Sequence, residues 1–204
     1  MPSTNSIQHG LEPASAWVKR WAHLLPSNEN VLDHESVQIL DLACGHGRHM
    51  QFLAGLGHRV LGVDRNAEAL KTASQWGETL QADIENAAWP LKGRSFTGVV
   101  VTNYLWRDLF PQILNSVAEG GVLIYETFSQ GNQAFGKPSR PEFLLQPGEL
   151  LQLCSGLRIV AFEEVFVPSP DRLIQRVVAI RLPSSLEPAA LSRILFPLKR
   201  LIRL

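Results

Sequence analysis

The sequence predicts an α/β protein with a doubly wound, mostly parallel sheet and helices on both faces. Short apolar runs alternate with segments of helical spacing, which is the pattern of parallel strands joined by crossover helices. The first apolar run stops at a glycine turn, Gly45 to Gly47, that leads directly into a helical segment. Acids follow several of the strands, at the end where ligands bind in such sheets.

The composition favours one ordinary globular domain. The chain has 204 residues, a formal net charge of +0 and two cysteines, so it offers neither a global basic field for nucleic acid nor a disulfide framework. The first ten residues lack the basic and apolar regions of a signal peptide, and no apolar stretch is long enough to cross a bilayer. We therefore expect a cytoplasmic protein without an integral membrane segment or a metal site.

The N-terminal region predicts one helix. Residues 1–11 are polar and expected to be loose, whereas residues 12–25 carry apolar side chains at helical spacing and end at Pro26. This helix is expected to cover an edge of the sheet or to close over a ligand. Its two tryptophans, Trp17 and Trp21, are expected to pack and not to bind substrate. Residues 27–36 form a polar connection.

The first strand, residues 37–42, ends in a ligand seat. The missing Cβ atoms of Gly45 and Gly47 leave room for a ligand against the backbone at a helix N-terminus. Asp41 at the strand end would repel a pyrophosphate and favours a cation or a hydrogen-bond donor such as an amino group. Met50 stands where a dinucleotide-binding fingerprint would have its third glycine.

The next two strands also end in acids. Residues 59–63 form the second strand, and Asp64 lies about twenty residues past the glycine turn, where a βαβ unit places an acid against a ribose diol. A carboxylate accepts hydrogen bonds from both hydroxyls. The alternative is that Asp64 caps the helix from about Asn66 to Trp76. Residues 79–82 form the third strand, which ends at Asp83.

The fourth and fifth strands lead into polar residues and then a long insert. Residues 96–102 form the fourth strand, and the helix after it is expected to end at residues 119–121. The fifth strand, residues 122–125, runs into Glu126. Residues 129–146 have no periodicity, so we expect a lid or a substrate-contacting loop. The remaining segments predict one short helix and two strands: residues 144–153, 157–167 and 173–182.

The stretch from Asp41 to Arg48 resembles the first motif of the class I S-adenosylmethionine-dependent methyltransferases. That resemblance implies a Rossmann-like, seven-stranded sheet with a terminal antiparallel strand, and S-adenosyl-L-methionine as cofactor. The family often has glycine where Ala43 stands, and alanine is acceptable there if its φ stays negative. The sequence alone supports about seven strands without fixing their order.

The resemblance also implies roles for individual residues. The third-strand acid, Asp83, would accept a hydrogen bond from the adenine amine, and Ile84 would pack on the ring. Asn103 and Tyr104 would face the transferable methyl group, and Arg48 is a candidate for the cofactor carboxylate. The full set of cofactor candidates is Asp41, Ala43, Gly45, Gly47, Arg48, Asp64, Asp83, Ile84 and Asn103.

A second resemblance concerns residues after the fourth and fifth strands. The run from Asn103 to Arg107 and the later residues 126–136 are similar to small-molecule methyltransferases related to tellurite-resistance proteins. The candidate catalytic residues are Asn103, Tyr104 and Glu126, although Glu126 has a structural acceptor role as its alternative. The candidate substrate residues are Tyr104, Arg107, Asn132 and Phe135; Arg107 would bind an anion or lie exposed near a helix start.

The sequence therefore predicts one methyltransferase domain, residues 1–185, and a basic amphipathic tail, residues 186–204, that contacts its own domain, a partner or a membrane surface. The expected reaction is in-line methyl transfer to a small molecule, with tRNA and protein acceptors left open. The alternatives are a cofactor-binding partner subunit without catalysis and an NAD(P)-dependent oxidoreductase.

Overall fold

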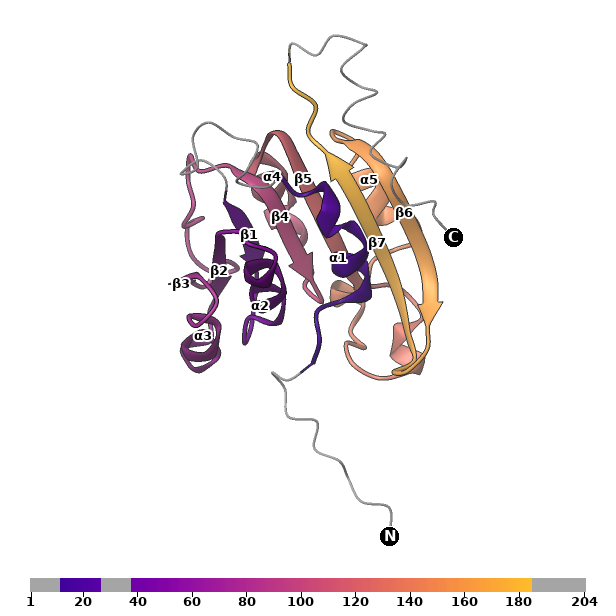
Figure 1. Ribbon diagram of the computed structural model, residues 1–204. Helices are drawn as coiled ribbons and strands as arrows, with labels where there is room; N and C mark the ends of the chain where they lie inside the picture. The colour runs from indigo at the N-terminus through magenta and orange to yellow at the C-terminus, as the bar shows by residue number, and fades with distance from the viewer. Residues whose placement is uncertain (1–11, 27–37, 185–204) are drawn as a thin grey trace, which may run out of the picture.

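A seven-stranded sheet organises the computed structural model, which describes residues 12–26 and 38–184 (Figure 1). The strands lie in the order β3-β2-β1-β4-β5-β7-β6. Their bounds are β1 Ile39–Leu42, β2 Val60–Asp64, β3 Glu78–Gln81, β4 Phe96–Thr102, β5 Val117–Phe128, β6 Arg158–Val167 and β7 Arg172–Ile180. The helices are α1 Ala16–Trp21, α2 Arg48–Gly55, α3 Ala67–Ala73, α4 Phe110–Asn115 and α5 Glu149–Leu153.

The sheet is parallel from β3 to β5, and β7 runs antiparallel to both of its neighbours. The strand order reverses between β1 and β4, because the chain winds outward to β3 and then returns to the other side of β1. Ligands bind beyond the carboxyl ends of the strands at such a switch point. The predicted doubly wound, mostly parallel, seven-stranded fold is confirmed.

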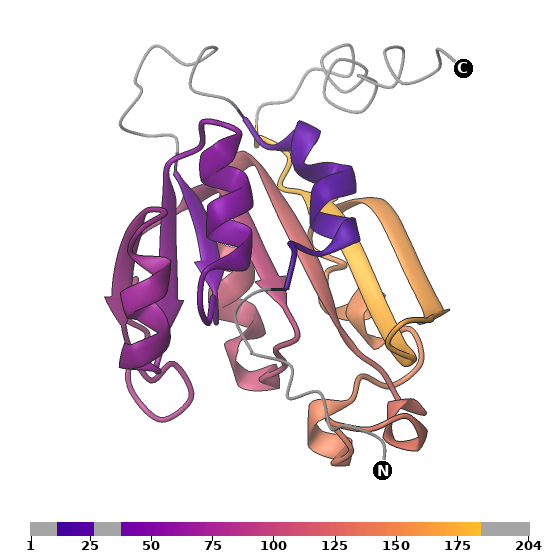
Figure 2. The same ribbon diagram turned by 60° about the horizontal axis from the view of Figure 1, so that its bottom comes forward.

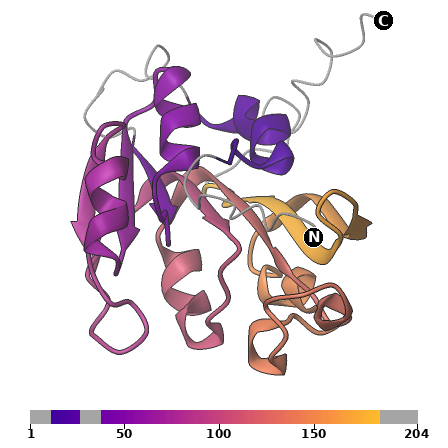
Figure 3. The ribbon, with the colours of Figure 1, turned by 90° about the horizontal axis from the view of Figure 1, so that it is seen from below.

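Helices cover both faces of the sheet (Figure 3). An apolar core on each face holds them to the sheet. Alternate residues of one strand enter opposite cores, as Leu40 and Ile39 do, because successive side chains of a strand point to opposite faces. Helices α1, α2 and α3 pack on one face, for example through Trp17 and Met50. Helices α4 and α5 pack on the other, for example through Phe110 and Leu150.

The predicted end of the helix before β5 is wrong. Helix α4 ends at Asn115, and residues 117–121 already belong to β5, where Val117 pairs with Phe96 of β4. A register shift separates this pair from the next one, Gly98 with Val122. The apolar spacing of Ile113 and Val117 fits a helix, but pairing with β4 buries Val117 to 1% exposure as part of a strand.

Helix α1 covers interior strands, so the prediction from the sequence that it covers an edge of the sheet is wrong. It packs on β5 and β7, and the Trp17 indole N–H donates to the carbonyl of Val177, 3.3 Å away. Ser15 caps the helix by accepting from the backbone N–H of Trp17. Trp17 is 1% exposed, so its predicted packing role is confirmed.

The insert at residues 129–146 is closed at its base. Its two ends form a bridge between Ser129 and Leu145, and it contains two short 3-10 turns, Asn132–Ala134 and Pro141–Phe143. Figure 2 shows it at the carboxyl end of β5, below β5 and β7. The predicted loose N-terminus, polar connection and basic tail lie outside the described residues. Within the described ranges no helix is long and apolar enough to cross a membrane.

Candidate active site

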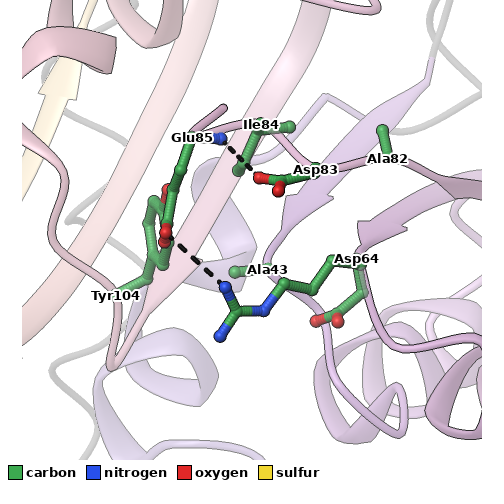
Figure 4. Close-up of a pocket in the computed structure, with 8 residues that line it drawn as sticks. Ala43, Asp64, Ala82, Asp83, Ile84, Glu85 and Tyr104 are labelled. Atoms are coloured by element: carbon green, nitrogen blue, oxygen red, sulfur yellow. Dashed lines mark hydrogen bonds and ion pairs between the residues drawn. The ribbon is translucent and has the colours of Figure 1, made fainter. Parts of the chain in front are cut away.

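Two adjoining pockets lie at the carboxyl ends of β1 to β4 and share Ala43. The Asp64 pocket has a volume of about 170 Å³ and is lined by Ala43, Asp64, Arg65, Ala82, Asp83, Ile84, Glu85 and Tyr104 (Figure 4). The Asn103 pocket has a volume of about 230 Å³ and is lined by Glu12, Ala43, Cys44, Gly45, His46, Arg48, His49, Thr102 and Asn103. Together they form one crevice across the ends of four strands.

The two glycines of the turn have different tasks. Gly45 has a φ of +54°, and a Cβ built on it meets nothing within 4 Å, so its missing side chain leaves the space open at the Asn103 pocket. Gly47 has a φ of +81°, and a Cβ there would lie 2.8 Å from the Cα of Ala73 in α3. Gly47 therefore allows α2 and α3 to pack closely, and its role in holding the cofactor stays a prediction.

Asp64 links the turn to the Asp64 pocket. Its Oδ2 accepts from the backbone N–H of Gly45 and its Oδ1 from that of Asn66, each at 2.8 Å. Each carboxylate oxygen can accept more than one hydrogen bond, so acceptor sites are left for hydroxyl donors in the pocket. The alternative role as N-cap is wrong, because the side chain of Asn66 caps α3.

The far wall of the Asp64 pocket follows β3. Asp83 accepts from the Asn86 side chain and from the backbone N–H groups of Glu85 and Asn86, and these hydrogen bonds lower the pKa of Asp83. Ile84 is 7% exposed and lines the pocket beside it. Figure 4 shows Asp83 and Ile84 together on this wall, with Asp64 and Tyr104 on either side of Ala43.

Arg65 and Glu85 were missed by the sequence analysis. They lie 3.6 Å apart as an ion pair and line the same pocket. Tyr104 lies beside them and not in the Asn103 pocket, so the structure places it away from the position expected for a residue that faces the methyl group. Arg65 could have been found from the sequence because it directly follows Asp64, the acid that ends β2. No sequence pattern points to Glu85.

Ala43 departs from the expected conformation. Its φ is +55° and not negative, so the backbone is in the left-handed region, which is unfavourable for a residue with a Cβ atom. This strain is of the order of 1–2 kcal/mol and sits where both pockets meet. The family's frequent glycine at this position has a direct physical reason here.

Asp41 is placed beneath the crevice instead of in it. It is 1% exposed, lines neither pocket, and its Oδ2 has no hydrogen-bond partner among the described residues. Burial raises the pKa of this carboxyl to about 7, although the charge of Arg48 and the backbone N–H of Met50 act in the opposite direction. The structure therefore corrects the predicted role of Asp41 as a direct cofactor ligand.

Asp41→Asn is expected to stabilise the protein above neutral pH by roughly 2–4 kcal/mol. The folded pKa lies above the ordinary value of 3.8, so between these values the folded state binds the proton more tightly than the unfolded state. Stability should therefore fall as the pH rises through this window, and the variant should lack that fall. Urea unfolding at pH 5 and at pH 8 checks it; equal pH slopes for both proteins would contradict it.

Asn103 stands at the end of β4 in a strained conformation. Its φ is +55°, and its backbone N–H donates to the carbonyl of Glu126 at 2.9 Å. Asparagine tolerates this left-handed conformation better than most residues. The geometry holds Asn103 at the wall of the Asn103 pocket, where the sequence analysis placed it.

A buried histidine lies behind Asn103. Burial lowers the pKa of His49 to about 3, so its ring is neutral at physiological pH. Its Nε2 faces the backbone N–H of Ser15 at 3.2 Å, and that contact requires Nε2 to accept. The proton then sits on Nδ1, which faces the Thr102 hydroxyl at 3.4 Å. His49 and Thr102 were missed although both lie at element ends: His49 is the second residue of α2, and Thr102 is the last residue of β4.

Glu126 is held by structural partners. It is 1% exposed, accepts from the Ser15 hydroxyl at 2.9 Å, and pairs with Arg176 at 3.4 Å. It lines neither pocket of the crevice. These contacts favour the structural acceptor role over the alternative role as a base.

Arg107 makes hydrogen bonds to the insert and to α5, and it does not line the crevice. Its guanidinium donates to both carboxylate oxygens of Glu149, at 2.6 and 2.8 Å, and to the carbonyls of Glu142 and Leu144. All its nitrogens are therefore engaged, which corrects its predicted role in binding an anionic substrate. The hydrogen bond from Arg107 lowers the pKa of Glu149.

Arg107→Met is expected to lower the free energy of unfolding at neutral pH by about 1–3 kcal/mol, without changing cofactor affinity. A depressed folded pKa stabilises above the ordinary value of 4.5 and loses that contribution as the pH falls through the folded value. The variant should therefore lose less stability than the parent on acidification. Denaturant titrations at pH 7 and pH 4 check it, and a stability gap that does not shrink at pH 4 would contradict it.

Asn132 and Phe135 also face away from the crevice. The Asn132 amide donates to the carbonyl of Pro138 and accepts from the backbone N–H of Leu173, so it ties the insert to β7. The Phe135 ring packs against Phe166 of β6, with centroids 5.4 Å apart. Neither lines the crevice, so the structure corrects both predicted substrate roles.

The thiol of Cys44 has no sign of reactivity. It lines the Asn103 pocket, but burial raises its pKa far above the ordinary value, so it stays protonated. Among the described residues no group of three histidines, cysteines or acids could hold a metal ion.

The sheet order, the glycine turn after β1 and the acid that ends β2 define a class I S-adenosylmethionine-dependent methyltransferase fold. Residues 39–121 match the family model of a methyltransferase domain. The match covers β1 through the start of β5, which includes every strand end of the crevice. The crevice therefore lies in the part of the chain that is similar to a methyltransferase domain.

Solved structures share this fold at low sequence identity. TehB from Haemophilus influenzae is 17% identical with a TM-score of 0.63, over 82% of this chain and 61% of its own, so this chain spans less than two thirds of that protein. A TehB-like S-adenosylmethionine-dependent methyltransferase from Corynebacterium glutamicum is 18% identical with a TM-score of 0.58, over 81% and 86%. The plantazolicin methyltransferase BpumL, solved with S-adenosylhomocysteine (SAH), is 15% identical with a TM-score of 0.56, over 71% and 76%. No curated protein sequence matches the chain.

The residues of the crevice fit S-adenosylmethionine as a cofactor. The adenosine part needs hydroxyl acceptors and an apolar surface for a ring, which Asp64 and Ile84 provide in one pocket. The amino-acid part needs backbone space and polar partners, which Gly45, Arg48 and Asn103 provide in the other. The shared wall at Ala43 joins the two halves, as a single elongated ligand requires.

Proposed function

We propose that the protein transfers the methyl group of S-adenosylmethionine to a small-molecule acceptor by in-line displacement. The observation that carries this proposal is the crevice itself, whose two pockets meet at Ala43 and place ribose-type acceptors and amino-acid-type partners in different halves. We also propose that residues 1–185 form one methyltransferase domain with residues 186–204 as a tail.

Each residue of the crevice has a positioning task in this proposal. Asp64 accepts from the ribose hydroxyls, while Asp83 accepts from the adenine amine and Ile84 supports the ring. Arg48 keeps its ion pair with Glu12 through Nη1 and offers its other N–H groups to the carboxylate of the amino-acid part. Asn103 fixes the end that carries the methyl group. The bound sulfonium supplies an already activated methyl group, so holding donor and acceptor in line accounts for much of the rate.

A small acceptor fits the crevice better than a macromolecule. Pockets of a few hundred Å³ suit small ligands, whereas a nucleic-acid surface needs clustered positive charge. The net charge of +0 offers no global attraction for RNA. The activated donor needs no covalent intermediate on Cys44, and a base is needed only where the acceptor must lose a proton during the transfer.

Methyl-labelled S-adenosylmethionine tests the proposal. The purified protein is incubated with three separate cell-extract pools: small metabolites, RNA and protein. We expect label in the metabolite pool, and no label there with the Asp64→Ala variant as control. Label in the RNA or protein pool alone would overturn the choice of acceptor. Cofactor binding without label in any pool would favour the partner-subunit alternative.

A further inference from the structure

A third pocket, of about 460 Å³, adjoins the crevice on the side of the N-terminal helix. It lies between the residues that lead into α1, the β6–β7 turn and the carboxyl end of β5. Its lining includes Glu12, Lys19, Arg48, Glu126, Ser169 and Arg172. Glu12 and Arg48 also line the Asn103 pocket, so the two spaces share a wall.

Two cations of this third pocket have no anionic partner among the described residues. Arg172 makes no ion pair there, and its Nε is buried without a hydrogen-bond partner. Lys19 is exposed on α1 and likewise has no carboxylate partner in the described ranges. A buried guanidinium N–H without a partner is costly, so Arg172 indicates a missing acceptor.

The two acids of the same pocket are already neutralised by other groups. Glu12 pairs with Arg48 at 2.9 Å, and Glu126 pairs with Arg176 at 3.4 Å while accepting from Ser15. The charge that remains unbalanced in the pocket is therefore positive, and it comes from Lys19 and Arg172.

We infer that this third pocket binds the methyl acceptor through an anionic group, a carboxylate or a phosphate, held between Arg172 and Lys19. The inference rests on the proposed function and names the substrate class for it. The planar guanidinium of Arg172 offers two parallel N–H donors to such a group, and Lys19 adds a mobile positive charge. The atom to be methylated would then point to the wall shared with the Asn103 pocket.

Specificity follows from the same residues. An acceptor without an anionic group would leave the Arg172 Nε–H unpaired, whereas an anion satisfies it. The pocket volume suits a small organic acid or phosphate ester and not a polymer. Cationic acceptors are disfavoured by the unbalanced charge.

The test is a calorimetric titration of two probes, benzoate and inorganic phosphate, into the protein saturated with SAH. We expect saturable binding of at least one probe, weakened roughly tenfold or more in Arg172→Gln and in Lys19→Gln. Arg172→Lys should recover part of the affinity. The matched control is Arg20→Gln, the neighbour of Lys19 on α1, which pairs with Glu163 outside the pocket and should leave binding unchanged.

The outcomes separate the two proposals. SAH binding in every variant shows that the protein is folded and that the cofactor site is intact. If SAH binds but neither anion does, or if both anions bind the Gln variants as tightly as the parent, the anionic acceptor is overturned and the methyltransferase proposal stands. If SAH does not bind the parent protein, the proposed function itself fails. A preference for benzoate or phosphate identifies the anionic group.

Discussion

Replacing Asp64 by alanine is expected to weaken SAH binding by about 100-fold or more. The carboxylate orders the glycine turn through the Gly45 N–H at 2.8 Å and is the acceptor for the ribose hydroxyls. Each hydrogen bond to a charged group contributes roughly 1.5–3 kcal/mol, and alanine removes at least two of them. Isothermal calorimetry of parent and variant measures the loss directly.

The control for this variant is Glu68→Ala. Glu68 is an exposed acid in the first turn of α3, close to Asp64 in sequence. It pairs with Lys71, and neither residue lines any of the three pockets. Glu68→Ala should keep the parental affinity for SAH. The affinity of Asp64→Asn should lie between those of the parent and Asp64→Ala, because the amide keeps one acceptor oxygen. An unchanged dissociation constant for Asp64→Ala would show that the ligand does not contact β2.

Gly47→Ala is expected to lower the free energy of unfolding by about 2–5 kcal/mol. The new Cβ would lie 2.8 Å from the Cα and 2.9 Å from the Cβ of Ala73, and neither atom can move without shifting α3. This overlap costs about 1–3 kcal/mol, and the φ of +81° adds about 1–2 kcal/mol. Urea denaturation followed by circular dichroism measures the change.

Gly45→Ala is the matched variant, because it changes the same turn without the overlap. Its Cβ would meet no atom of the protein within 4 Å, so only the strain of a φ of +54° remains, about 1–2 kcal/mol. The same Cβ would enter the space of the ligand, so SAH binding should be lost although the protein folds. If Gly45→Ala bound SAH normally, the crevice would not be the cofactor site.

Much of the fold was predictable from the sequence, because its apolar residues follow the helical spacing in some segments and form the short runs of buried strands in others. The valines of β4 alternate between the two cores, as Val99 and Val100 do, and the run that contains them was located from residues 96 to 102 without error. The end of α4 was predicted too late in the sequence, and this error had a physical cause. Val117 fits the spacing of a helix, and only its pairing with Phe96, distant in sequence, decides for a strand.

The cofactor half of the site was more predictable than the acceptor half. Asp64 ends a strand, and Asp83 and Asn103 follow strand ends. The carboxyl ends of neighbouring parallel strands meet at one edge of the sheet. Their roles as ligands of the cofactor stay predictions. Asp41 precedes the strand end by one residue, and that single position places it in the core instead of the crevice.

Residues that depend on tertiary packing could not be located in this way. Arg107 and Asn132 have the chemistry of substrate ligands, but their partners lie in the insert and in β7, so the sequence gives no sign that they are already engaged. Glu12 and Lys19 reach the site only because α1 crosses to β5 and β7. No local pattern in residues 12–25 reports that crossing.

A calorimetric comparison of SAH with NADH on the purified protein tests the cofactor assignment directly. We expect saturable binding of SAH and none of NADH. Met50, fully buried in α2, occupies the position of the third fingerprint glycine, and the crevice offers hydrogen-bond acceptors instead of a site for a pyrophosphate. Binding of NADH without SAH would contradict both the cofactor and the assignment of the two pockets.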